Sequence, residues 1–158
     1  MINTAILPGT FDPITLGHLS LIERGAKMAQ ELIVAVAASP SKQPLFDLDT
    51  RVRMISKAVE AWPNVKVIGF LGLLTDFAAE HNCELLIRGV RTTMDFEYEM
   101  GLAHMYRQLL PQMECVLLPP KSPYSYLSST AVRELLKHGG DITHFVPKSV
   151  LPYLKASF

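Results

Sequence analysis

Five short apolar segments alternate along the chain with longer stretches of helical periodicity. The apolar segments span residues 4–7, 32–37, 65–70, 84–87 and 115–118, and their length is typical of buried strands. Successive parallel strands need a crossover connection, usually a helix, and such crossovers are right-handed. The alternation therefore predicts an α/β fold, a Rossmann-like doubly wound five-stranded parallel sheet with helices on both faces.

The helices are predicted from apolar residues spaced three and four apart. Leu19, Ile22, Ala26 and Ala29 share one predicted helix face, and residues 128–138 form a last helix that ends at the glycine pair 139–140. A chain of 158 residues can bury about two thirds of its unfolded surface in one core. We therefore expect a single domain over residues 1–158.

Charge and composition exclude several classes of protein. Fifteen basic residues balance fifteen acidic ones, which argues against nonspecific binding to nucleic acid or to an anionic membrane. The N-terminus carries no signal-type apolar run and no segment is apolar enough to span a bilayer, so a cytoplasmic protein is expected. Cys83 and Cys115 lack metal-site spacing, which predicts two reduced thiols and no protein metal site.

The connection between the first strand and the first helix predicts a phosphate site. Gly9 and Pro13 shape the turn, and Gly17 and His18 open the next helix. A helix N-terminus offers unpaired amides and a positive dipole end to an anion, and His18 lies in the first turn. The alternative is an ordinary strand-to-helix connection with a surface histidine.

Basic and hydroxyl side chains follow the other predicted strands. Residues 39–42 end in Lys42, residues 88–91 contain two arginines, and residues 119–130 carry Lys121 and several hydroxyls. The carboxyl ends of parallel strands lie at one edge, where ligands bind, so a polyphosphate site is predicted there.

Two alternatives accompany this prediction. One of the arginines could pair with a carboxylate of residues 95–99 instead of a phosphate. Ser128 or Ser129 could serve only as the N-cap of the last helix, whereas three successive hydroxyls with Arg133 nearby favour a second anion site. The sequence contains no P-loop, no Gly-x-Gly-x-x-Gly and no Gly-x-Ser-x-Gly.

Three short segments of the chain resemble the two signature motifs of the nucleotidylyltransferase superfamily, the first two segments making up one motif. Residues 9–13 read Gly-Thr-Phe-Asp-Pro, residues 15–18 read Thr-Leu-Gly-His and residues 127–133 read Leu-Ser-Ser-Thr-Ala-Val-Arg. From Ala5 to about Pro147 the chain is similar to the bacterial phosphopantetheine adenylyltransferases, in which Thr at the position of Thr15 is usual. The resemblance implies transfer of AMP from ATP to 4′-phosphopantetheine, giving dephospho-coenzyme A and pyrophosphate. It also implies a homohexamer, coenzyme A as a feedback ligand, and Mg²⁺ carried by the ATP phosphates.

The resemblance assigns roles to particular residues. The catalytic residues it implies are His18, as transition-state stabiliser, with Lys42 and Arg91. The residues it places at phosphopantetheine are Thr10, Lys42, Leu74 and Arg88. Those it places at ATP are Thr10, Phe11, Gly17, His18, Arg88, Gly89, Val90, Arg91, Glu99, Tyr124, Ser125, Tyr126, Leu127, Ser128, Ser129 and Thr130.

Gly72 and Leu74 depart from the residues usual in this family, so contacts to the pantetheine arm are less defined than those to ATP. Two other functions stay open at this point. One is adenylyl or cytidylyl transfer to another phosphorylated acceptor, and the other is nucleotide binding without catalysis.

Overall fold

The computed structural model describes residues 2–155 and contains a parallel five-stranded sheet. The strand order is β3-β2-β1-β4-β5. The strands are β1 (Ile2–Gly9), β2 (Ala29–Ala37), β3 (Val65–Phe70), β4 (Leu85–Gly89) and β5 (Glu114–Leu118). The predicted fold class is confirmed, and each predicted strand overlaps an observed one.

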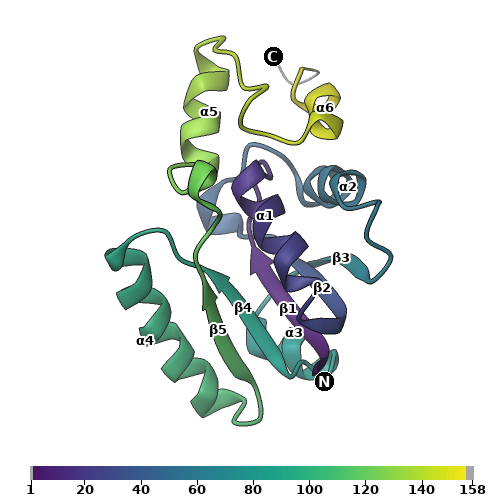
Figure 1. Cartoon of the computed structure of the whole chain (residues 1–158), viewed down its shortest axis with the longest axis vertical. Helices are drawn as coiled ribbons and strands as arrows, with labels where there is room; N and C mark the ends of the chain where they lie inside the picture. The colour runs from purple at the N-terminus through teal and green to yellow at the C-terminus, as the bar shows by residue number, and fades with distance from the viewer. Residues whose placement is uncertain (1, 156–158) are drawn as a thin grey trace.

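Helices cover both faces of this sheet (Figure 1). One face is covered by α1 (Leu16–Gly25) and α2 (Leu48–Ala58). Helices α5 (Ser129–Lys137) and α6 (Leu151–Lys155) lie beyond the carboxyl ends of the strands and contribute to the same apolar cluster. The opposite face is covered by α3 (Leu74–Glu80) and α4 (Thr93–Leu109). Short 3₁₀ turns occur at Pro40–Lys42, Ser122–Tyr124 and Lys148–Val150.

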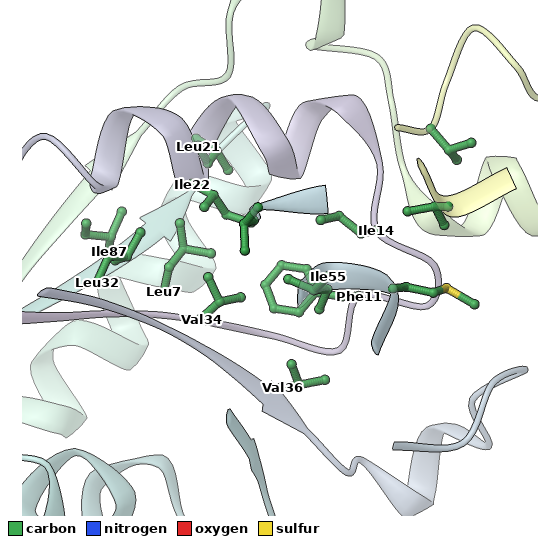
Figure 2. Packing of buried hydrophobic residues seen from close by; sticks show 14 of the residues in the cluster. Leu7, Phe11, Ile14, Leu21, Ile22, Leu32, Val34, Val36, Ile55 and Ile87 are labelled. Carbon is green, nitrogen blue, oxygen red and sulfur yellow. The ribbon is translucent and has the colours of Figure 1, made fainter. Parts of the chain in front are cut away.

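The alternation of side chains along β1 divides the core into two apolar clusters. Ala5 and Leu7 belong to the cluster beneath α1, which contributes Leu21 and Ile22 (Figure 2). Ile6 points to the other face, because successive strand residues face opposite sides of a sheet. Since the central part of β1 is buried on both faces, Ala5, Ile6 and Leu7 form an unbroken apolar run.

The first helix is shorter than its apolar spacing predicts. The helix ends at Gly25, with Ala26 as its C-cap, and Ala29 is the first residue of β2, where it pairs with Ile2 of β1. The predicted helix face through Ala29 is therefore wrong, because sheet pairing competes with helical periodicity at this residue. The last predicted helix, residues 128–138, is confirmed as α5 with its two caps.

The sheet has its switch point at β1. This strand pairs with β2 on one side and with β4 on the other. From β1 the chain builds β2 and β3 on one side, and after β3 it crosses back to build β4 and β5 on the other side of β1. Loops that leave β1 and β4 therefore diverge and open a crevice at the carboxyl ends of the strands. Among residues 2–155, no helix is long and apolar enough to cross a membrane.

The turn after β1 depends on a close approach between Gly9 and Phe11. A β-carbon at Gly9 would lie 2.9 Å from two ring atoms of Phe11, which is buried and has a positive φ of 51°. The ring is enclosed by the core beneath α1 and cannot move aside freely.

We predict that Gly9→Ala lowers the free energy of unfolding by about 1–3 kcal/mol, the usual cost of overpacking a core. Urea unfolding measures this change. Gly101→Ala is the matched control, because nothing lies within 4 Å of a β-carbon there and alanine favours the interior of α4. Equal stability of the Gly9 variant and the wild type would contradict the proposed steric role.

Candidate active site

A cavity of about 590 Å³ lies at the carboxyl ends of the strands. Its wall is built from the turn after β1, the loops after β2, β4 and β5, and the first turns of α1 and α5. These segments are distant in the sequence and meet because all five strands run in the same direction.

Most residues predicted for the site line this cavity. The wall contains Thr10, Phe11, Gly17, His18, Lys42, Leu74, Arg88, Gly89, Arg91, Glu99, Tyr124, Leu127, Ser128, Ser129 and Thr130. Val90, Ser125 and Tyr126 are not part of the wall. The sequence predicted that these loops converge at one edge of the sheet, and the structure brings them together there. The roles of the individual residues stay predictions.

The first turn of α1 fixes the orientation and the tautomer of His18. Thr15 is the N-cap of α1, and its backbone N–H donates to Nδ1 of His18 over 3.0 Å. The Thr15 hydroxyl lies 3.1 Å from the same nitrogen. Since a backbone N–H only donates, Nδ1 is the acceptor and the ring proton is on Nε2. The ring therefore has one N–H donor left for a ligand.

The surroundings keep His18 neutral. Burial, and to a smaller extent the positive charge of Arg91, together lower the pKa of His18 from 6.5 to about 4. The Phe11 ring packs edge-on against the imidazole, with 5.1 Å between the ring centroids. At neutral pH the group is therefore an uncharged hydrogen-bond donor.

Arg88 forms a two-point ion pair with Glu99. Its Nε and a terminal nitrogen each donate to one Glu99 oxygen at 2.7 Å. Burial lowers the pKa of Arg88, but the hydrogen bonds and charge of Glu99 outweigh burial, so the pKa is raised. The second terminal nitrogen lies 3.5 Å from the Pro8 carbonyl, a long contact that leaves this nitrogen able to donate to an anion.

Arg91 joins the loop after β4 to the loop before α5. It lies 3.3 Å from Asp95 and donates to the Leu127 carbonyl over 2.9 Å. Both arginines thus pair with carboxylates of residues 95–99, which is the alternative that the sequence left open. Pairing does not consume their donors, because a guanidinium carries five N–H groups.

The three hydroxyls before and within α5 already have partners in the protein. Ser128 is the N-cap and accepts from the Ala131 amide over 3.1 Å. Ser129 donates to the Pro13 carbonyl over 2.8 Å, and Thr130 accepts from Arg133. The Ser129 bond holds the N-terminus of α5 against the turn after β1, and the other two bonds lie within the first turns of α5.

Asp12 is a site residue to which the sequence assigned no role. Its carboxylate accepts from the amides of Leu45 and Phe46 at 2.8 and 3.0 Å and lies 3.6 Å from Arg133. Arg133 also donates to the Asp12 carbonyl. The only signal in the sequence is the place of Asp12 between Gly9 and Pro13.

The cavity carboxylates are thus occupied by arginines and amides. Within residues 2–155, no cluster of three or more His, Cys, Asp or Glu side chains could hold a metal ion. Cys83 and Cys115 are free thiols, and burial raises the pKa of each above that of an exposed thiol.

Comparisons with known proteins identify the family and the fold of this chain. The model of the cytidylyltransferase-like family matches residues 6–135. Two solved structures share the fold, with TM-scores of 0.75 and 0.77 and only 17% and 12% sequence identity. One is a putative nicotinate-nucleotide adenylyltransferase from Vibrio parahaemolyticus, aligned over 98% of this chain and 99% of its own. The other is a bifunctional NMN adenylyltransferase/ADP ribose pyrophosphatase from Francisella tularensis, aligned over 99% of this chain and 49% of its own.

Sequence similarity narrows the relationship within that family. A protein of Actinobacillus succinogenes is 55% identical over 149 residues, which cover 94% of this chain and 92% of that protein. A protein of Sodalis glossinidius is 50% identical over 156 residues, 99% of this chain and 98% of its own. Both are named phosphopantetheine adenylyltransferase. The chain therefore belongs to the cytidylyltransferase-like family and, within it, to the phosphopantetheine adenylyltransferases.

The lowered pKa of His18 predicts a specific pH dependence. Between pH 6.5 and about 4, the unfolded chain binds a proton at His18 that the folded chain does not bind. The free energy of unfolding therefore falls as the pH is lowered through this window. NMR titration should show a neutral His18 ring down to about pH 5, and His18→Asn should lose less stability over the same range. A ring that titrates near pH 6.5 would contradict the assignment.

Proposed function

We propose that the chain transfers the adenylyl group of ATP to 4′-phosphopantetheine, forming dephospho-coenzyme A and pyrophosphate. The observation that carries this proposal is the convergence of His18, Lys42 and Arg91 on one cavity at the switch point of the sheet. Similarity at 50% and 55% identity to proteins of that name supports this choice of substrates.

The acceptor's own phosphate serves as nucleophile, because it is already anionic at neutral pH and needs no catalytic base. The protein therefore contributes orientation and electrostatic stabilisation. As the acceptor oxygen bonds to the α-phosphorus, the bond to the pyrophosphate oxygen breaks and its electron pair leaves with pyrophosphate. Negative charge develops on the α-phosphate oxygens and on the leaving group.

Each catalytic residue has a distinct position relative to this charge. The Nε2–H of His18 donates to an α-phosphate oxygen, a role that suits a neutral ring whose other nitrogen is occupied by Thr15. Lys42 and Thr10 hold the acceptor phosphate on one side of the cavity. Arg91, the Thr130 hydroxyl and the backbone amide of Ser129 at the N-terminus of α5 bind the β- and γ-phosphates on the other side.

Magnesium is proposed as an ion that enters on the triphosphate. The cavity carboxylates Asp12, Asp95 and Glu99 are bonded to arginines or amides, so they form no separate cage. The hydroxyls of Thr10, Ser129 and Thr130 fit the water shell of an ATP-bound ion, because Mg²⁺ usually keeps several waters. When bound, the ion neutralises part of the phosphate charge.

A homohexamer and feedback by coenzyme A complete the proposal. Helix α4 exposes large apolar side chains, which supports self-association: Met94, Phe96, Tyr98, Met105 and Leu109. Coenzyme A combines the adenine nucleotide and pantetheine parts of the two substrates, so it would compete for the same cavity. A cytoplasmic location and the organisation of residues 1–158 as one domain stay predictions.

Pyrophosphate release tests the substrate assignment. We expect release from ATP and Mg²⁺ with 4′-phosphopantetheine, and much slower release with nicotinamide mononucleotide or glycerol phosphate. The reason is that Lys42, Leu74 and Arg88 line the cavity, where we propose that they hold a phosphate and an apolar arm. Activity with one of the other acceptors alone would overturn the proposal, and binding of ATP without any transfer would favour a regulatory nucleotide-binding protein.

Loss of the His18 donor should affect turnover more than binding. We predict that His18→Ala lowers kcat by about a hundredfold or more, as expected for a donor used in the transition state, with little change in either KM. His138→Ala is the control, because this exposed histidine is only the C-cap of α5. Near-normal kcat in the His18 variant would contradict the assignment.

A further inference from the structure

Arg51 is a buried cation that the proposed mechanism does not use. It lies on α2, is only 1% exposed, and does not contribute to the wall of the cavity. A buried arginine is rare unless its charge and its donors are satisfied. Its contacts therefore indicate what it does.

The Arg51 guanidinium donates to four main-chain carbonyl groups. Nε bonds the Phe46 carbonyl at 2.9 Å, and one terminal nitrogen bonds the carbonyls of Thr10 and Ala37 at 2.7 Å each. The other terminal nitrogen bonds the Ala38 carbonyl at 3.1 Å. These acceptors and Arg51 form what we call the Arg51 cluster.

The acceptors belong to three segments that end beside the cavity. Thr10 is in the turn after β1, Ala37 and Ala38 are at the end of β2, and Phe46 precedes α2. Buried carbonyls need donors, and here the sheet no longer supplies them because the strands have ended. One planar guanidinium satisfies all four, which the compact ammonium of a lysine cannot do in this geometry.

The same segments carry the residues proposed to hold the acceptor phosphate. The Thr10 hydroxyl lies 3.3 Å from the Ser39 hydroxyl, and Lys42 ends the 3₁₀ turn that follows Ser39. Ser39 and Gln43, which flank this turn, have positive φ values of 48° and 46°. Such conformations persist where surrounding contacts hold them, and the Arg51 cluster holds both ends of this loop.

Charge around Arg51 favours its retention in the core. Burial lowers the pKa of Arg51, and the carboxylates of Asp12 and Asp47 offset this lowering only in part. The side chain remains a cation, since arginine is protonated at all physiological pH values. The Asp12 carboxylate in turn accepts from the amides of Leu45 and Phe46. The loop between β2 and α2 is therefore bonded both by Arg51 and by Asp12.

We propose that Arg51 is a positioning residue that fixes Thr10 and Lys42 relative to one another, and thereby orients the acceptor phosphate for attack. This inference rests on the proposed function for its substrate and on the Arg51 cluster for its geometry. The nucleotide side of the cavity has separate supports, such as the Arg91 bond to the Leu127 carbonyl, so Arg51 acts mainly on the acceptor side.

Arg51→Lys, with Arg53→Lys as matched control, tests the proposal. Arg53 lies on the same helix, is exposed and bonds only the Thr50 hydroxyl among the contacts described. We expect Arg51→Lys to lower kcat/KM for phosphopantetheine by about 10- to 100-fold, the cost of a misplaced reactant. The KM for phosphopantetheine should rise and the KM for ATP should change little. If kcat falls while the KM for phosphopantetheine and the KM for ATP both stay unchanged, the variant simply contains fewer folded molecules. That result would overturn the proposal.

Hydrogen exchange of the substrate-free protein provides a second measurement that does not depend on the proposed function. Arg51→Lys should speed exchange of the amides in residues 38–46, and Arg53→Lys should not. Unchanged exchange in this segment overturns the positioning role.

If the wild type releases no pyrophosphate with phosphopantetheine, the proposed function fails, while hydrogen exchange still decides whether Arg51 orders residues 38–46. Arg51→Gln replaces the lysine variant if that variant does not fold, and failure of both to fold assigns Arg51 to folding and overturns the proposal.

Discussion

The parallel pairing of β1 between β2 and β4 is the constraint on which the rest of the structure depends. It brings the carboxyl ends of all five strands to one edge, and with them the basic residues that follow the strands. Basic groups gathered in this way would repel one another, but each arginine of the wall is paired. Arg88 lies against Glu99, Arg91 against Asp95 and Arg133 against Asp12. The site therefore holds its donors in fixed positions without a large excess of charge, which agrees with a chain whose formal net charge is zero.

Burial is the main reason that His18 is neutral, and the positive charge at this edge of the sheet adds to it. Burial and the charge of Arg91 disfavour the imidazolium form, and the amide of Thr15 occupies Nδ1. A charged histidine would add to the repulsion among the basic groups, whereas a neutral one adds a directed donor at no electrostatic cost. Arg91, which we propose to bind the phosphates of ATP, thus also helps to keep His18 a neutral hydrogen-bond donor.

The sequence predicted those parts of the fold and site that depend on local pattern. The strands, α5 and the convergence of the loops follow from apolar runs and turn residues, and most predicted site residues line the cavity. Arg51 could not be predicted in this way, because a charged residue in a helical pattern is ordinarily exposed. Its burial depends on carbonyls 5, 13, 14 and 41 positions away, which only the folded chain brings together. The pairing of Arg88 with Glu99 was one of two open alternatives, since spacing alone does not show which anion an arginine faces.

The turn after β1 connects the two halves of the cavity. On the acceptor side, the Thr10 carbonyl accepts from Arg51, and the Asp12 carboxylate accepts from the amides that precede α2. On the nucleotide side, the carbonyls of Asp12 and Pro13 accept from Arg133 and Ser129 of α5. A shift of this turn would therefore move both of the segments that we propose to bind phosphates. Within the stretch from Gly9 to His18, side chains line the cavity, while main-chain carbonyls bond the segments on its two sides.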